Sequence, residues 1–72
     1  MKDLSYKFGK RLQKIRKEKG LTQLELAEMI DVSSDFIGLM ERGVNSPSFK
    51  TLEKLSETLK IPVYKFFQFD DE

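Results

Sequence analysis

Helix-start and helix-end signals recur along this chain and divide it into short segments, each with apolar residues at helical spacing. From Leu4 to Lys19 the apolar positions are four, four and three residues apart, which places them on one face of an α-helix. Gly20 can end this helix, because glycine adopts left-handed backbone angles at little cost. The predicted buried face consists of Leu4, Phe8, Leu12 and Ile15.

A capping box marks the start of a second, shorter helix. The hydroxyl of Thr22 can accept a hydrogen bond from the backbone N–H of Glu25, and the Glu25 carboxylate can accept one from the N–H of Thr22. The helix is expected to begin at Gln23 and to end about eight residues later at Asp31, a residue type that tolerates turns. Its predicted buried residues are Leu26, Ala27 and Ile30.

A third helix is predicted from Ser34 to Arg42. Ser33 precedes it as a capping residue, and Gly43 follows it as a helix end. The segment from Val44 to Pro47 contains turn-forming residues and therefore predicts an exposed loop. The residues of the third helix that are expected to face the core are Ile37 and Met40.

Two further helices are predicted after this loop. Ser48 caps the first of them, and Pro62 begins a short last helix that ends at Phe67, because proline suits the first helical turn. With Phe66 and Phe67 completing the core, we expect one all-α domain of five helices, with its core over about residues 8–67 and a frayed tail at 68–72. The apolar residues of the fourth helix are Phe49, Leu52, Leu55 and Leu59.

A chain of 72 residues without cysteine or histidine is unsuited to several kinds of site. It can form no disulfide, and it lacks the ligands of common zinc sites and the usual nucleophile and general-base pairs. We therefore expect neither an enzyme nor a bound metal or other cofactor. The basic N-terminus is followed by an amphipathic pattern rather than an apolar run, so we expect no signal peptide, no membrane partner and a cytoplasmic protein.

Charge is distributed unevenly along the chain. Residues 1–20 carry eight lysines or arginines and two acidic residues, whereas residues 21–72 carry five basic and ten acidic residues. The basic end is a candidate surface for a polyanion, and a solvated lysine-rich helix face is the alternative. Charge alone does not distinguish the two.

Two short helices joined by a turn at Asp31 to Ser33 predict a helix-turn-helix over Gln23 to Arg42, whose second helix would enter the major groove of DNA. The segment LTQLELAEMIDVSSDFIGLMERG resembles this motif in the Cro and phage-repressor (XRE) family. The resemblance extends from about Phe8 to Phe67. It implies a λ-repressor-like fold and a prokaryotic or phage regulator that binds double-stranded DNA at an operator, as a controller protein of a restriction-modification system does.

The resemblance also implies structural roles for four residues. It makes Ala27 the small residue at which the second and third helices meet, and Ile37 a core-facing residue of the recognition helix. It pairs Arg16 with Glu41 and so ties the first helix to the end of the third. The alternative for this pair is an exposed contact of little energetic value.

The same resemblance implies two groups of DNA contacts. Gln23 would bind a phosphate at a helix N-terminus, and the alternative is that it is an ordinary polar residue at a helix start. Asp35 would accept a hydrogen bond from a cytosine, and the alternative is that it only stabilises the start of its helix. For Phe36 the alternative is packing, and for the loop residues it is a plain turn. The expected base contacts are Ser34, Asp35, Gly38 and Leu39. The expected phosphate contacts are Lys10, Thr22, Gln23, Phe36, Arg42, Asn45, Ser46 and Ser48.

The stretch near the C-terminus contains more aromatic residues than a short helix can bury. The family uses its last helix to dimerise, so the resemblance implies a twofold homodimer whose recognition helices lie about 34 Å apart. An interaction module with a protein partner, such as an antitoxin that binds a toxin, is the alternative function. The expected dimer interface contains Leu59, Ile61, Val63, Tyr64, Phe66 and Phe69.

Overall fold

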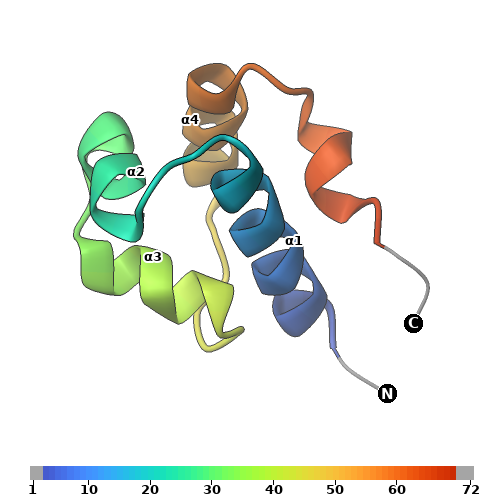
Figure 1. Cartoon of the computed structure of the whole chain (residues 1–72). Helices are drawn as coiled ribbons and strands as arrows, with labels where there is room; N and C mark the ends of the chain where they lie inside the picture. The colour runs from blue at the N-terminus through green and yellow to red at the C-terminus, as the bar shows by residue number, and fades with distance from the viewer. Residues whose placement is uncertain (1–2, 70–72) are drawn as a thin grey trace.

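The computed structural model describes residues 3–69, which form four α-helices followed by one 3₁₀ helix (Figure 1). The elements are α1 (Leu4–Glu18), α2 (Gln23–Ile30), α3 (Ser34–Glu41), α4 (Phe49–Leu59) and η1 (Val63–Phe67). Within this range there is no strand, and no helix is long and apolar enough to span a bilayer. The predicted all-α class is confirmed, whereas residues 70–72 of the predicted frayed tail lie outside the described range.

The prediction of a fifth α-helix was wrong. η1 has five residues, and its hydrogen bonds join residues three apart. The N–H of Lys65 donates to the carbonyl of Pro62 at 3.0 Å, and the N–H of Gln68 donates to that of Lys65 at 3.4 Å. No side chain caps its start at Pro62. A segment this short and uncapped forms the tighter 3₁₀ turn instead of a regular α-helix.

A side-chain cap begins each of the four α-helices. Thr22 and Glu25 form both bonds of the predicted capping box, with lengths of 3.0 and 2.9 Å. Asp3, which the sequence patterns did not identify, accepts from the N–H of Tyr6 at 2.9 Å and caps α1. Each such cap contributes about 1 kcal/mol, so local sequence determines where the helices begin. The caps of α3 and α4 are the predicted Ser33 and Ser48.

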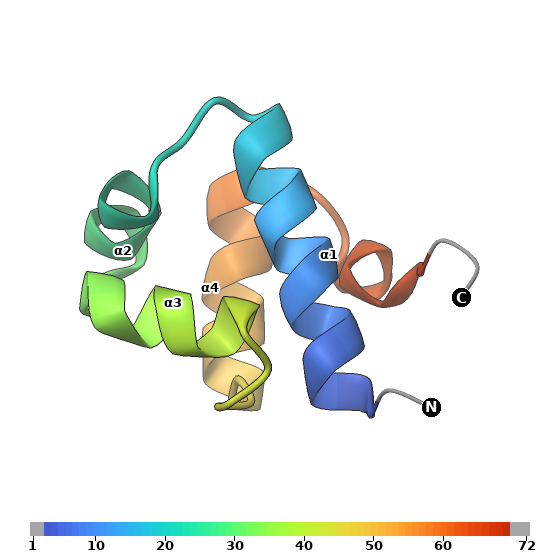
Figure 2. The same cartoon turned by 60° about the horizontal axis from the view of Figure 1, so that its bottom comes forward.

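α1 occupies the middle of the fold. In both views α2 and α3 lie on one side of α1, and η1 lies on the other (Figure 1, Figure 2). α2 packs against α3 and α4, while η1 packs against α1 and α4. This arrangement places the helix-turn-helix and the aromatic C-terminal segment on opposite flanks of α1.

One apolar core joins the five elements. Two residues of the predicted helix faces do not belong to it, because Leu4 is 59% exposed and Phe49 is 86% exposed. Each is the first residue of its helix, and its side chain remains largely in solvent. The buried apolar residues are Phe8, Leu12, Ile15, Leu26, Ala27, Ile30, Ile37, Met40, Leu52, Leu55, Leu59 and Phe66.

The approach of α1 to the end of α3 depends on two glycines. A Cβ at Gly9 would lie 2.3 Å from the carbonyl oxygen of Met40 and 2.7 Å from that of Glu41. A Cβ at Gly43, where φ is +79°, would lie 2.8 Å from the Cα of Tyr6. A side chain at either position would therefore force the two segments apart.

Candidate nucleic-acid interface

α2 and α3 are joined by a tight turn and form a helix-turn-helix. Asp31 ends α2 in the left-handed conformation with φ of 62°, and the N–H of Val32 donates to the carbonyl of Ala27 at 3.0 Å. Ala27 and Ile37 are both fully buried. α2 and α3 pack against each other, and this packing sets the orientation of α3.

The outward side of this unit carries a hollow of about 300 Å³, which we name the reader hollow. It contains the four predicted base contacts together with two of the predicted phosphate contacts. The tertiary structure thus brings the start of α2 next to the outward face of α3. The residues that line the hollow are Gln23, Ser34, Asp35, Gly38, Leu39 and Arg42.

Gly38 leaves space that two longer side chains share. A Cβ at Gly38 would lie 3.5 Å from Nη1 of Arg42 and 3.6 Å from Oε1 of Gln23. The side chains of Gln23 and Arg42 therefore converge over Gly38, although they come from opposite ends of the motif. Arg42, expected at a phosphate, lies among the positions expected at base edges, and a guanidinium there can donate two hydrogen bonds to guanine.

A buried ion pair adjoins the reader hollow. Nε of Arg16 donates to Oε2 of Glu41 at 2.6 Å, and Nη2 of Arg16 donates to Oε1 at 3.0 Å. The two side chains are only 8% and 1% exposed, so the pair is a buried bidentate one and not the exposed contact considered as the alternative. Nη1 of Arg16 also donates to the carbonyl of Leu21 at 2.8 Å. These bonds tie α1 both to α3 and to the segment that precedes α2.

Gln23 is attached to the same ion pair. Its Nε2 donates to Oε1 of Glu41 at 3.0 Å, the oxygen that also accepts from Arg16. This bond orients the amide while leaving its oxygen and second hydrogen for other partners. No local sequence pattern indicates this contact, because Gln23 and Glu41 are 18 positions apart.

Three of the predicted phosphate contacts form hydrogen bonds inside the chain through their hydroxyl groups. Thr22 caps α2, and Ser48 accepts from the N–H of Thr51 at 3.1 Å to cap α4. The hydroxyl oxygen of Ser46 lies 2.7 Å from that of Ser5, which connects the loop after α3 to α1. All three hydroxyls lie at exposed positions, so they have a structural role whether or not a phosphate binds there.

The remaining predicted phosphate contacts have varied surroundings. Phe36 is half-buried and packs against the core, in line with the packing alternative. Asn45 is half-buried, and its backbone N–H donates to the carbonyl of Leu39 at 3.3 Å. Lys10 is exposed, with its Nζ 5.8 Å from the centre of the Tyr6 ring.

Two of the six residues predicted for the dimer interface are not on the surface. Leu59 and Phe66 lie in the core of this chain, so neither side chain is available to a partner. η1 is held against α1 and α4, and this packing turns Phe66 inward towards Phe8, at a centroid distance of 6.0 Å. Tyr64 is 61% exposed, and the other three positions are accessible to differing extents. The candidate surface therefore narrows to Ile61, Val63, Tyr64 and Phe69.

The sequence pattern of the helix-turn-helix family (HTH_3) matches residues 12–66. The chain belongs to this family. The matched range includes every residue of the reader hollow and both partners of the buried ion pair. Membership confirms the resemblance that the segment around α2 and α3 indicated.

Two relatives in this family illustrate the range of chain lengths. The transcriptional regulator SinR of Bacillus licheniformis is 37% identical over 66 residues, which are 90% of this chain and 60% of SinR. The control protein C.MunI of a Mycoplasma species is 37% identical over 68 residues, which are 93% of this chain and 92% of C.MunI. The chain thus spans little more than half of SinR but nearly all of C.MunI.

Solved structures in the family share the fold. The restriction-modification controller protein C.AhdI of Aeromonas hydrophila matches with a TM-score of 0.84 and 35% identity, over 88% of this chain and 91% of C.AhdI. SinR, the master regulator for biofilm formation, has been solved in complex with DNA, and that chain matches with a TM-score of 0.78 and 35% identity. This second match covers 85% of the present chain and 98% of the SinR chain.

Proposed function

We propose that this protein is a sequence-specific transcriptional regulator that binds double-stranded DNA. In this proposal α3 lies in the major groove, while the N-terminus of α2 contacts the adjacent phosphates. A homodimer presents two copies of α3 about 34 Å apart, so its operator is twofold symmetric. The chain acts as one unit, without catalysis or a cofactor, in the cytoplasm of a prokaryotic or phage-infected cell. Occupying the operator represses transcription.

The reader hollow is the observation that carries this proposal. Its amide, hydroxyl, carboxylate and guanidinium groups supply both donors and acceptors, as the edges of base pairs require. Leu39 offers an apolar surface that suits a thymine methyl group. The SinR complex with DNA supports the same use of the fold in this chain.

The decisive experiment is selection of bound sequences from a pool of random duplex DNA. We expect an enriched twofold-symmetric motif whose half-sites are about 10 base pairs apart from centre to centre. Affinity for the selected operator should fall steeply with salt, by about 0.9 log units per log unit of salt for each phosphate neutralised. A pool that shows no enrichment, together with a flat salt response, would overturn the proposal.

Replacing Gln23 with alanine is expected to weaken operator binding by about tenfold, because the variant lacks one hydrogen bond to a charged phosphate. Affinity is measured by fluorescence anisotropy at a temperature where circular dichroism shows both proteins folded. Gln68→Ala is the matched control, since Gln68 is exposed and lies outside the reader hollow. Equal affinities for the wild type and Gln23→Ala would contradict the assigned role.

The double variant Val63→Lys/Tyr64→Lys is expected to be monomeric at concentrations where the wild type dimerises. Two charges in an apolar interface cannot be desolvated without a large cost. The control is Leu24→Lys/Met29→Lys, which places the same charges at two comparably exposed apolar residues of α2. Sedimentation velocity distinguishes the species. A wild type that stays strictly monomeric at high micromolar concentration, with and without DNA, would exclude the dimer.

A further inference from the structure

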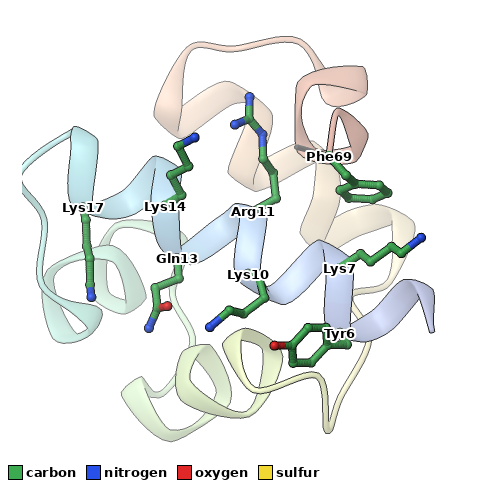
Figure 3. Close-up of a pocket in the computed structure, with 8 residues that line it drawn as sticks. All are labelled: Tyr6, Lys7, Lys10, Arg11, Gln13, Lys14, Lys17 and Phe69. Atoms are coloured by element: carbon green, nitrogen blue, oxygen red, sulfur yellow. The ribbon is translucent and has the colours of Figure 1, made fainter. Parts of the chain in front are cut away.

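A second hollow, of about 410 Å³, lies along the outer side of α1, and we name it the α1 groove (Figure 3). It shares no residue with the reader hollow. Tyr6 lines it near the start of α1, and Phe69 lines it from the C-terminal segment. Its remaining lining residues are Lys7, Lys10, Arg11, Gln13, Lys14 and Lys17.

The lining of the α1 groove is rich in positive charge. Five of its lining residues are lysine or arginine, and none of the described residues that line it is acidic. The reader hollow differs, because its single cation Arg42 is accompanied by the carboxylate of Asp35. Of these two hollows, the one with more positive charge therefore lies beside the predicted DNA-reading surface and not within it.

Two rows of polar side chains extend from α1 along the groove, and they contain four of its five cations. Lys10, Gln13 and Lys17 extend towards α3, whereas Arg11 and Lys14 extend towards η1 (Figure 3). Nε of Arg11 donates to the carbonyl of Lys65 at 2.8 Å, which fixes its side chain. From Tyr6 to Lys17 the helix rises by about 16 Å. The two rows thus flank a stretch of α1 that is long enough to face several successive phosphates of one DNA strand, which repeat every ~3.4 Å along the axis.

One end of the α1 groove adjoins the loop after α3. Tyr6 lies against Gly43, and the Ser5 hydroxyl is 2.7 Å from that of Ser46 in this loop. A DNA backbone that contacts the loop can therefore continue along α1 without crossing an acidic surface of the groove. The row of Lys10, Gln13 and Lys17 lies on the side of α1 that faces α3 (Figure 3).

We propose that the α1 groove binds the phosphate backbone of DNA that flanks the operator. The inference rests on the proposed function, because it assigns a second contact to the same duplex. The proposed contact also accounts for the affinity for DNA. Electrostatic contacts supply much of the affinity between proteins and DNA. The reader hollow has one cation and one carboxylate, so it neutralises few phosphates by itself. Flanking DNA bends towards α1 to reach the groove, and the contacts made there offset the bending cost.

The test compares two DNA lengths and two double variants. One duplex contains only the two half-sites, and the other extends by about 10 base pairs, one helical turn, on each side. Lys14→Gln/Lys17→Gln removes two charges from the groove, and Lys19→Gln/Lys60→Gln removes two exposed charges outside it. Lys14→Arg/Lys17→Arg retains the charge. Affinity is measured by anisotropy over a salt series, and the far-UV spectrum verifies that each variant is folded.

The wild type is expected to bind the longer duplex about tenfold more tightly than the short one. For Lys14→Gln/Lys17→Gln, the longer duplex should bind no more tightly than the short one. The slope of log affinity against log salt should become shallower by about 0.9 for each lost phosphate contact. The affinity of this variant for the short duplex should stay within about twofold of the wild-type value. The Lys19/Lys60 control and the arginine variant should retain the gain.

An equal gain for the wild type and the groove variant would overturn the proposal. The proposal would also be overturned if the groove variant kept its higher affinity for the longer duplex but lost binding to a polyglutamate peptide. That result would assign the groove to an acidic protein. The proposed function can fail separately. If selection finds no operator, the comparison of short and longer duplexes can still be made with DNA of random sequence. A higher affinity for the longer duplex that depends on Lys14 and Lys17 would then support DNA binding by the groove.

Discussion

Replacing Glu41 with alanine is expected to lower the free energy of unfolding by about 3–5 kcal/mol. The substitution leaves the guanidinium of Arg16 buried without its carboxylate partner, and it also removes the acceptor of Gln23. A chain of 72 residues has a free energy of unfolding of roughly 4–11 kcal/mol. The expected loss is therefore a large fraction of the total stability of the chain.

Urea denaturation followed by circular dichroism measures this loss. Glu57→Ala is the matched control, because Glu57 is exposed on α4 and its removal should cost less than about 0.5 kcal/mol. The double variant Arg16→Met/Glu41→Leu should be more stable than Glu41→Ala, since it leaves no unpaired charge in the core. A loss below about 1 kcal/mol for Glu41→Ala would show that the pair is solvated in solution.

Replacing Gly9 with alanine is expected to destabilise the fold by about 3 kcal/mol or more. The added methyl group would lie 2.3 Å from the carbonyl oxygen of Met40, and backbone atoms cannot move aside as a flexible side chain can. α1 would have to shift away from α3, which strains the nearby pair of Arg16 and Glu41. Helix propensity alone predicts the opposite result, a gain of about 1 kcal/mol for alanine.

Gly38→Ala provides the comparison within the same molecule. Both glycines are buried in helices, but a methyl group at Gly38 would meet the neighbouring side chains of Arg42 and Gln23 at 3.5 Å or more, an ordinary contact distance. We expect a gain of up to about 1 kcal/mol in the free energy of unfolding, together with altered operator affinity, because the methyl group enters the reader hollow. If Gly9→Ala were as stable as Gly38→Ala in urea, the close approach of α1 and α3 would be refuted.

Several elements of the fold could be predicted from local sequence alone. The capping box of Thr22 and Glu25 and the caps at Ser33 and Ser48 lie where the sequence places them, because each bond joins residues three positions apart. The core-facing residues of α2 and α3 followed from helical spacing. The composition of the reader hollow was also accessible from sequence, since most of its residues lie on one face of α3.

Interactions between distant segments were not accessible in this way. Helical spacing assigned Leu4 and Phe49 to the core, but both are the first residues of their helices and are mostly exposed. Spacing likewise could not indicate that Gln23 shares an acceptor with Arg16, or that Phe66 turns inward while Tyr64 stays exposed.

The sequence by itself determined the four α-helices, three of their four caps and most of the face that each buries, because these depend on bonds and spacings within about one helical turn. Only the tertiary structure decided which outward residues of different helices share a surface. Packing of α1 against α3 joined Gln23 to the buried ion pair and extended the basic face of α1 to the loop after α3. The physical reason is that these contacts depend on the relative positions of whole helices, which close packing at Gly9 and Gly43 sets.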